Sequence, residues 1–173
     1  MSEQEYSWDV HIFKGEGRYA FQPIIQNEWL RRINADYYRI LDENESAYML
    51  GCTTIEMMDY IKNSPRPSVQ VKDAPQSERL SKYGVWSKFF KGNLLTAIMY
   101  EGNVYSIFSQ ERRSRRGGGS GYCGQIEYIE LPNTATAEEI GEAILKAFDA
   151  AEKYYSVGKY KPKRQRKTTK TED

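Results

Sequence analysis

Residues 125–148, QIEYIELPNTATAEEIGEAILKAF, constrain the fold most, because they specify a strand, a turn and a capped helix in succession. Residues 125–131 are rich in β-branched and aromatic side chains, which favour a strand. Pro132 ends that strand, since proline has no N–H to donate to a sheet. Thr136 is a suitable N-cap, and Glu139 stands three residues later as its capping-box partner. The sequence therefore predicts a helix that begins directly after Thr136.

The predicted helix has one apolar face and one charged face. Its apolar residues recur at helical spacing: Ile140, Ile144, Ala147, Phe148 and Ala151. The opposite face carries charged residues, including pairs four positions apart in the favourable order: Glu138, Glu142, Lys146, Asp149 and Lys153. This pattern predicts a helix that packs one side against a sheet.

The same unit occurs a second time, ninety positions earlier in the chain. Residues 36–58, DYYRILDENESAYMLGCTTIEMM, align without a gap to residues 126–148. The equivalent positions include caps, apolar residues and glycines: Ser46 with Thr136, Leu50 with Ile140, and Gly51 with Gly141. Because the caps and glycines agree as well as the apolar positions, the sequence predicts one strand–turn–helix unit used twice.

Two hairpins precede the two units. Strand-like residues 8–13 and 19–25 flank Gly15-Glu16-Gly17 and predict the first hairpin. Residues 93–101 and 104–110 flank Gly102-Asn103, a suitable two-residue loop, and predict the second. The order hairpin, strand, helix, repeated once, predicts an α+β fold. We expect one mainly antiparallel sheet with both helices packed on it.

The remaining segments are predicted to be irregular. Residues 28–34 read as one helical turn or a loop, and residues 62–81 as a polar connection with a short helix near 77–82. Five glycines within residues 117–124 predict no regular structure there, and Gly158 is expected to end the second helix. We expect the following organisation: one domain over 1–158, repeat halves at about 8–64 and 85–157, a linker at 65–84, and a disordered basic tail at 159–173.

Composition excludes several classes of protein. A chain of 173 residues is long enough to bury a core, and its fourteen Tyr, six Phe and three Trp predict largely aromatic packing. No run approaches the roughly 20 apolar residues of a membrane helix, and the N-terminus does not resemble a signal peptide. Cys52 and Cys123 are too few for a disulfide framework, so we expect reduced thiols in a cytoplasmic protein.

Charge is unevenly distributed along the chain. Residues 159–173 hold seven basic and two acidic residues, which is +5, and leave −4 for residues 1–158 because the whole chain carries +1. Four arginines form one basic loop: Arg112, Arg113, Arg115 and Arg116. The sequence thus predicts an acidic domain with a basic loop and a basic tail.

Catalytic patterns are lacking in the sequence. His11 is the only histidine and lies in a predicted strand, so spacing supports no Ser-His-Asp or Cys-His site. One histidine and two separated cysteines do not supply a zinc site. The loop of residues 112–124 lacks the Gly-Lys-Ser/Thr of a phosphate-binding loop. We therefore expect no enzyme activity and no cofactor.

Acidic residues at the predicted helix starts are the first candidate for partner binding: Asp42, Glu43, Glu45, Glu138 and Glu139. Carboxylates there interact favourably with the helix dipole, at about 0.3–1 kcal/mol each, and that alone explains them structurally. The functional interpretation is an anionic surface that steers a basic partner. The four arginines of the basic loop are the second candidate, as a contact for phosphate or nucleic acid.

A family resemblance adds to these patterns. Ile129-Glu130-Leu131-Pro132 followed by residues 136–144, TAEEIGEAI, resembles a closing motif of bacterial immunity proteins of contact-dependent growth inhibition and related polymorphic toxin systems. The glycine-rich segment 117–124 before the strand resembles the same family, as do residues 88–101 and 19–51. The resemblance implies a cytoplasmic, non-enzymatic protein that binds and blocks a cognate toxin domain, often a nuclease, and is a monomer outside the complex. It carries no family contact onto a numbered residue.

Two hypotheses follow. In the first, the chain neutralises a toxin domain by protein–protein interaction, through a few buried aromatic residues and ion pairs. In the second, it associates with nucleic acid through the basic loop and tail, with an affinity that falls steeply as salt rises.

Overall fold

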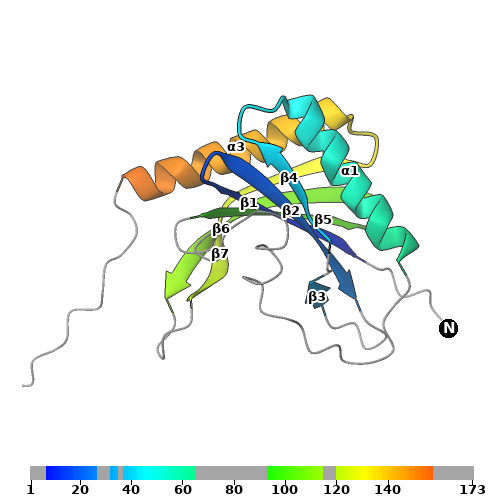
Figure 1. The fold of residues 1–173 in the computed structure, drawn as a ribbon, viewed down its shortest axis with the longest axis horizontal. Helices are drawn as coiled ribbons and strands as arrows, with labels where there is room; N and C mark the ends of the chain where they lie inside the picture. The colour runs from blue at the N-terminus through cyan, green and yellow to red at the C-terminus, as the bar shows by residue number, and fades with distance from the viewer. Residues whose placement is uncertain (1–6, 27–31, 35–36, 65–92, 115–119, 158–173) are drawn as a thin grey trace, which may run out of the picture.

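In the part of the chain that the structure describes, seven strands form one antiparallel sheet, and two helices cover one of its faces (Figure 1). The computed structural model describes residues 7–26, 32–34, 37–64, 93–114 and 120–157. The elements are β1 (Trp8–Gly15), β2 (Arg18–Gln26), β3 (Arg32–Asn34), β4 (Arg39–Asp42), α1 (Ala47–Asn63), β5 (Leu94–Glu101), β6 (Val104–Ser114), β7 (Ser120–Pro132) and α3 (Ala137–Ser156). The strand order is β3-β2-β1-β5-β6-β7, and β4 also pairs with β2. The predicted α+β fold is confirmed.

The two halves of the sheet contain strand pairs with equivalent registers. β1 and β5 pair antiparallel at the centre of the sheet, where His11 lies opposite Ala97. In the first half β2 pairs with β4, and Tyr19 lies opposite Leu41. In the second half β6 pairs with β7, and Tyr105 lies opposite Leu131. Tyr19 and Tyr105, in the second strands of the two hairpins, are therefore equivalent and lie 86 residues apart. Leu41 and Leu131, in the strands that lead into the helices, are equivalent and lie 90 residues apart.

Both hairpins turn through two residues with positive φ. Glu16 and Gly17 have φ of 54° and 74°, and Gly102 and Asn103 have φ of 57° and 65°. This is the turn whose twist matches that of antiparallel strands. Each turn also forms a backbone hydrogen bond to the segment just before a helix. The Gly17 carbonyl accepts from the N–H of Glu43, and the Asn103 carbonyl accepts from the N–H of Asn133. The two units therefore have the same internal connections.

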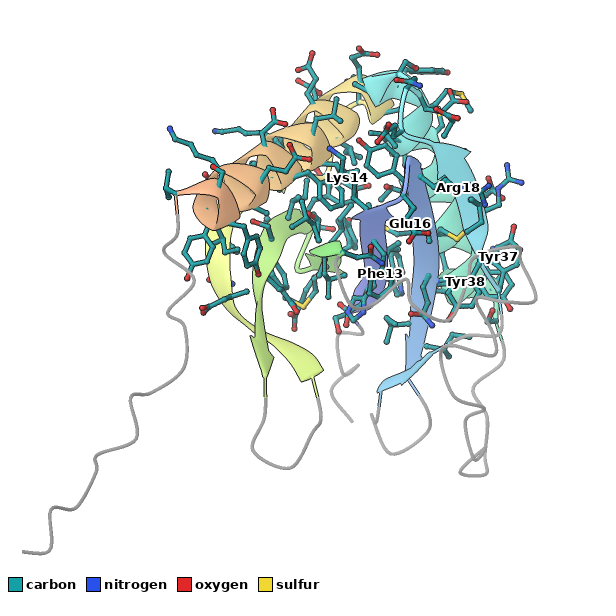
Figure 2. All side chains as sticks on the ribbon, turned by 60° about the vertical axis from the view of Figure 1, so that its left-hand side comes forward. Phe13, Lys14, Glu16, Arg18, Tyr37 and Tyr38 are labelled. Atoms are coloured by element: carbon teal, nitrogen blue, oxygen red, sulfur yellow. The ribbon has the colours of Figure 1, made fainter. Side chains whose placement is uncertain are left out.

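The core lies between the sheet and the two helices. Sheet residues on this side include Val10, Ile12, Phe21, Ile98 and Ile107, and the helices contribute Leu50, Met57, Ile140, Ile144 and Phe148. Burial of each large side chain contributes roughly 1.5–3 kcal/mol. Figure 2 shows Lys14 on the α3 side of β1 and Phe13 on the opposite side, as strand alternation requires.

The prediction of an irregular segment at residues 117–124 is wrong from Ser120 onward. β7 begins at Ser120 and pairs with an extended β6, so that Gly121 lies opposite Arg113. Glycine disfavours strands only weakly, and two long antiparallel partners supply the hydrogen bonds that a local pattern does not show. The pairing of β6 with β7 is irregular only locally, because its register shifts between Ser109 and Arg112. On the β7 side, Gly124 has a φ of 83°.

The prediction of a helical turn or loop at residues 28–34 is wrong for β3. β2 extends past the end of β4, and β3 pairs with that extension from Ile24 to Gln26. Pro23 lies between the β4 and β3 pairings, where its missing N–H costs no ladder bond on that side. The predicted linker, the short helix at 77–82 and the tail at 159–173 lie outside the described residues.

Candidate partner-binding surface

The two helices meet at their N-terminal ends. Ser46 and Thr136 are the N-caps, and each side chain accepts a hydrogen bond from the backbone N–H three residues on. A Cβ on Gly51 would lie 1.7 Å from the carbonyl oxygen of Ala137, and a Cβ on Gly141 would lie 1.7 Å from that of Ala47. The contact is reciprocal, so each glycine lets the backbone of the other helix approach.

This contact brings the two predicted acidic groups to the same end of the molecule. Two of the five are engaged locally. Asp42 Oδ1 accepts hydrogen bonds from Asn44 N at 2.9 Å and Asn44 Nδ2 at 3.0 Å. Glu139 Oε2 accepts from Thr136 N at 2.7 Å and from its hydroxyl at 3.0 Å, and these bonds lower the pKa of Glu139.

Glu43 and Glu138 are exposed and Glu45 is half-buried. These three carboxylates lie near two converging helix N-termini, whose dipoles they offset. These carboxylates therefore stabilise the helix N-termini, and their role in binding a partner stays a prediction.

The basic loop lies at the other end of the sheet. Arg112 and Arg113 belong to the far end of β6, where they pair with Tyr122 and Gly121. β6 begins at Val104 opposite Pro132, shortly before α3, so Arg112 is separated from the helix starts by roughly 25 Å of strand. Arg115 and Arg116 lie outside the described residues. Among the described residues, Arg112 and Arg113 therefore do not form one site with the acidic candidates.

Exposed apolar side chains on α1 are the feature that sequence reasoning missed. Tyr48 is 55% exposed, Met49 37% and Tyr60 38%. Tyr48, Cys52, Glu56 and Tyr60 follow at intervals of four, so they line one side of the helix, with Met49 beside them. We call these five residues the α1 ridge. Its signal in the sequence was that α1 has apolar residues on both sides, whereas the outer face of α3 is charged.

Neighbouring groups hold the ridge in place. The Tyr60 ring stacks on Tyr37 with centroids 4.6 Å apart, and Tyr37 OH donates to Glu56 Oε1 at 3.0 Å. Arg39 Nε lies 3.4 Å from the same Glu56 oxygen. Burial and the bond to Glu56 raise the pKa of Tyr37. The ridge is therefore partly preorganised at its Tyr60 end.

Tyr48 lies at the other end of the ridge, close to α3. Its side-chain hydrogen bond with Cys52 and the nearby charge of Glu138 raise the pKa of the Tyr48 phenol. As an exposed tyrosine, Tyr48 offers an apolar ring with a polar tip, which suits an amphipathic contact.

The single histidine lies within the sheet. In the sheet His11 lies directly opposite Gln22 and Ala97 and edge-on to Phe13, with ring centroids 6.3 Å apart. Among the residues that the structure describes, no group of three His, Cys, Asp or Glu is placed to hold a metal ion. No helix in the described part of the chain is long and apolar enough to cross a membrane.

Comparisons with known proteins find likeness in fold but not in sequence. No protein-family model matches the chain, and no curated protein matches it. A Neisseria meningitidis protein of unknown function matches over 86% of this chain and 98% of its own, at a TM-score of 0.60 and 18% identity. A chain of the CdiA-CT/CdiI toxin and immunity complex from Yersinia pseudotuberculosis matches over 84% of this chain and 97% of its own, at a TM-score of 0.61 and 11% identity.

Proposed function

We propose that this chain is an immunity protein that binds and neutralises a cognate toxin domain of a contact-dependent growth inhibition system. The observation that carries the proposal is the fold shared with a chain of a toxin and immunity complex, over nearly the whole length of that chain. The sequence resemblance of residues 129–144 supports the same family. The α1 ridge supports protein binding, because exposed Tyr and Met are enriched at protein interfaces.

The toxin is proposed to be a nuclease. The body of the chain is acidic, and the exposed Glu138 lies near Tyr48 of the ridge that we consider for binding. A nuclease presents a basic surface to its substrate, and an acidic inhibitor complements such a surface. The chain acts in the cytoplasm by occupying its partner and performs no reaction of its own.

Co-expression tests this function directly. We expect the gene immediately upstream to encode a protein whose C-terminal domain is the toxin. That domain is produced from an inducible promoter in a bacterial host, alone or together with the chain. We expect growth arrest with degraded nucleic acid from the domain alone, and normal growth when the chain is present. Arrest that persists at equal or excess chain would refute the proposal.

Removal of residues 159–173 separates protein binding from nucleic-acid binding. A chain of residues 1–158 is expected to protect the host as well as the full chain does. Loss of protection, together with loss of a salt-sensitive shift of RNA or DNA in gels, would instead favour action through the basic tail.

A further inference from the structure

The duplicated frame provides an internal control for the α1 ridge. α3 occupies the equivalent place in the second unit, and its residues at the equivalent positions are almost all charged. The pairs are Tyr48 with Glu138, Met49 with Glu139, Cys52 with Glu142, Glu56 with Lys146, and Tyr60 with Ala150. Since α3 forms with charged residues there, the frame itself does not require exposed apolar side chains at the ridge.

Met49 occupies the third position of α1, where a glutamate would stabilise the helix N-terminus more than methionine does. In α3, Glu139 completes the capping box by accepting the backbone N–H of Thr136. In α1 the side chain of Ser46 accepts from Met49 N, but a methionine cannot return a hydrogen bond to the cap. Exposed methionine here is costly for stability and favourable for adaptable binding, which is typical of a contact residue.

Charges around the ridge indicate the chemistry of its partner. Glu45, Asp59 and Glu138 border it. The nearby cations are used within the molecule: Arg39 lies beside Glu56, and Lys62 Nζ lies 5.7 Å from the centre of the Trp8 ring. A ridge of exposed Tyr and Met side chains that contains Glu56 and has acidic neighbours fits a partner that has apolar pockets surrounded by Lys and Arg.

We infer that the α1 ridge is the surface on which the toxin domain docks, with Tyr48 and Met49 entering apolar pockets of a basic face. The inference rests on the proposed function and deepens it by naming the contact surface. From residue 48 to residue 60 the ridge extends about 18 Å, which suits one side of a standard protein interface. The outer face of α3 beyond Glu138 stays outside the contact.

Binding measurements on matched variants test this surface. The probe is the purified C-terminal domain encoded immediately upstream, with affinity measured by calorimetry. The double variant Tyr48→Glu/Met49→Glu copies the α3 residues into α1, and it is expected to weaken binding at least about 30-fold. Its melting temperature should stay level or rise by about 2 °C, since Glu at position 49 completes a capping box with Ser46.

The control carries the same change of net charge on the other helix. Lys146→Ala/Lys153→Ala alters the outer face of α3, and its affinity is expected to stay within about threefold of wild type. Tyr60→Ala is a second ridge variant and is expected to weaken binding about tenfold without changing the fold.

The outcomes distinguish this inference from the proposed function. Tight binding by wild type that the ridge variants retain, or that only the α3 control loses, would overturn the ridge as the docking surface and leave the immunity role standing. A wild-type chain that does not bind the domain at all would overturn both.

Discussion

The first unit, β1-β2-β4-α1, and the second unit, β5-β6-β7-α3, share a frame but present different surfaces. Their hairpin turns and strand-pair registers correspond, and so do their N-cap residues and glycine contacts. Their helices differ on the outside, where α1 exposes Tyr48, Met49 and Tyr60 and α3 exposes charged residues. The caps, turns and glycines that the two units share are therefore required by the fold, whereas the outer helix residues that differ are available for binding a partner.

The units also differ beneath their helices. Lys14 of β1 donates to Glu152 of α3 at 2.5 Å and lies 5.9 Å from the ring centres of Tyr19 and Phe148. At the position equivalent to Lys14, β5 carries Tyr100, which stacks on Trp8 at 5.1 Å. One unit therefore closes this end with an ion pair and the other with stacked aromatics.

Substitution of the crossing glycines should have the largest effect. Gly51→Ala and Gly141→Ala each place a Cβ 1.7 Å from a backbone carbonyl oxygen, so the helices must separate. The helix propensity gained, about 1 kcal/mol, is smaller than the overpacking cost, and we expect each variant to lose roughly 2–3 kcal/mol. Melting temperatures should fall by roughly 5–10 °C.

The two glycine variants also test the symmetry of the frame. Similar losses are expected because the contacts are reciprocal, and Glu142→Ala on the exposed face is a control within about 0.5 kcal/mol of wild type. A chain that tolerates alanine at one glycine and not at the other would show that the two helices do not cross as equivalents.

Loss of the Lys14–Glu152 ion pair should have an intermediate effect. The side chains are 20% and 51% exposed, so we expect a double-mutant cycle of Lys14→Met and Glu152→Gln to give a coupling of about 0.5–1 kcal/mol. A coupling near zero would mean that this end of the core is held by packing alone, as in the other unit.

The same pair predicts a pH dependence. Burial lowers the pKa of Lys14, but the hydrogen bond to Glu152 and nearby charges outweigh it, so its pKa lies above the usual 10.5. A raised lysine pKa stabilises the fold fully below 10.5 and ceases to do so as pH rises through the folded value. Thermal unfolding across this range should therefore show the stability difference between wild type and Lys14→Met shrinking at high pH.

Local signals made most of the frame predictable from sequence. The helices begin at Ala47 and Ala137, directly after the predicted caps, because Ser46 and Thr136 satisfy free N–H groups within one turn. The extension of β6 and β7 was not predictable in this way. It depends on pairing between residues such as Arg113 and Gly121, and no local pattern records which strand lies alongside.

The candidate surface was less predictable than the frame. Acidic residues near helix starts are visible in sequence, but the hydrogen bonds that occupy Asp42 and Glu139 are seen only in the structure. The α1 ridge was missed because an apolar residue in a helix is assigned to the core by default. Only the position of α1 on the sheet shows that Tyr48 and Met49 point away from it.

Removal of the capping box should have the smallest effect. Glu139→Ala removes the acceptor for Thr136 N, and we expect the melting temperature at pH 7 to fall by about 2 °C. Hydrogen bonds from Thr136 lower the pKa of Glu139 below its ordinary 4.5, so this stabilisation is present above 4.5 and is lost as pH falls through the folded value. A difference that persists in strong acid would contradict a role for the charged carboxylate.

Side-chain footprinting of the complex tests most directly whether the first unit binds the partner. Tyr48 and Tyr128 are similarly exposed, at 55% and 45%, but Tyr128 lies on the second unit, where its hydroxyl donates to Glu130. Oxidation by hydroxyl radicals is measured for the free chain and for its complex with the domain encoded upstream. We expect strong protection of Tyr48, Met49 and Tyr60 with Tyr128 unchanged. Protection of Tyr128 while the α1 ridge stays reactive would show that the partner binds elsewhere.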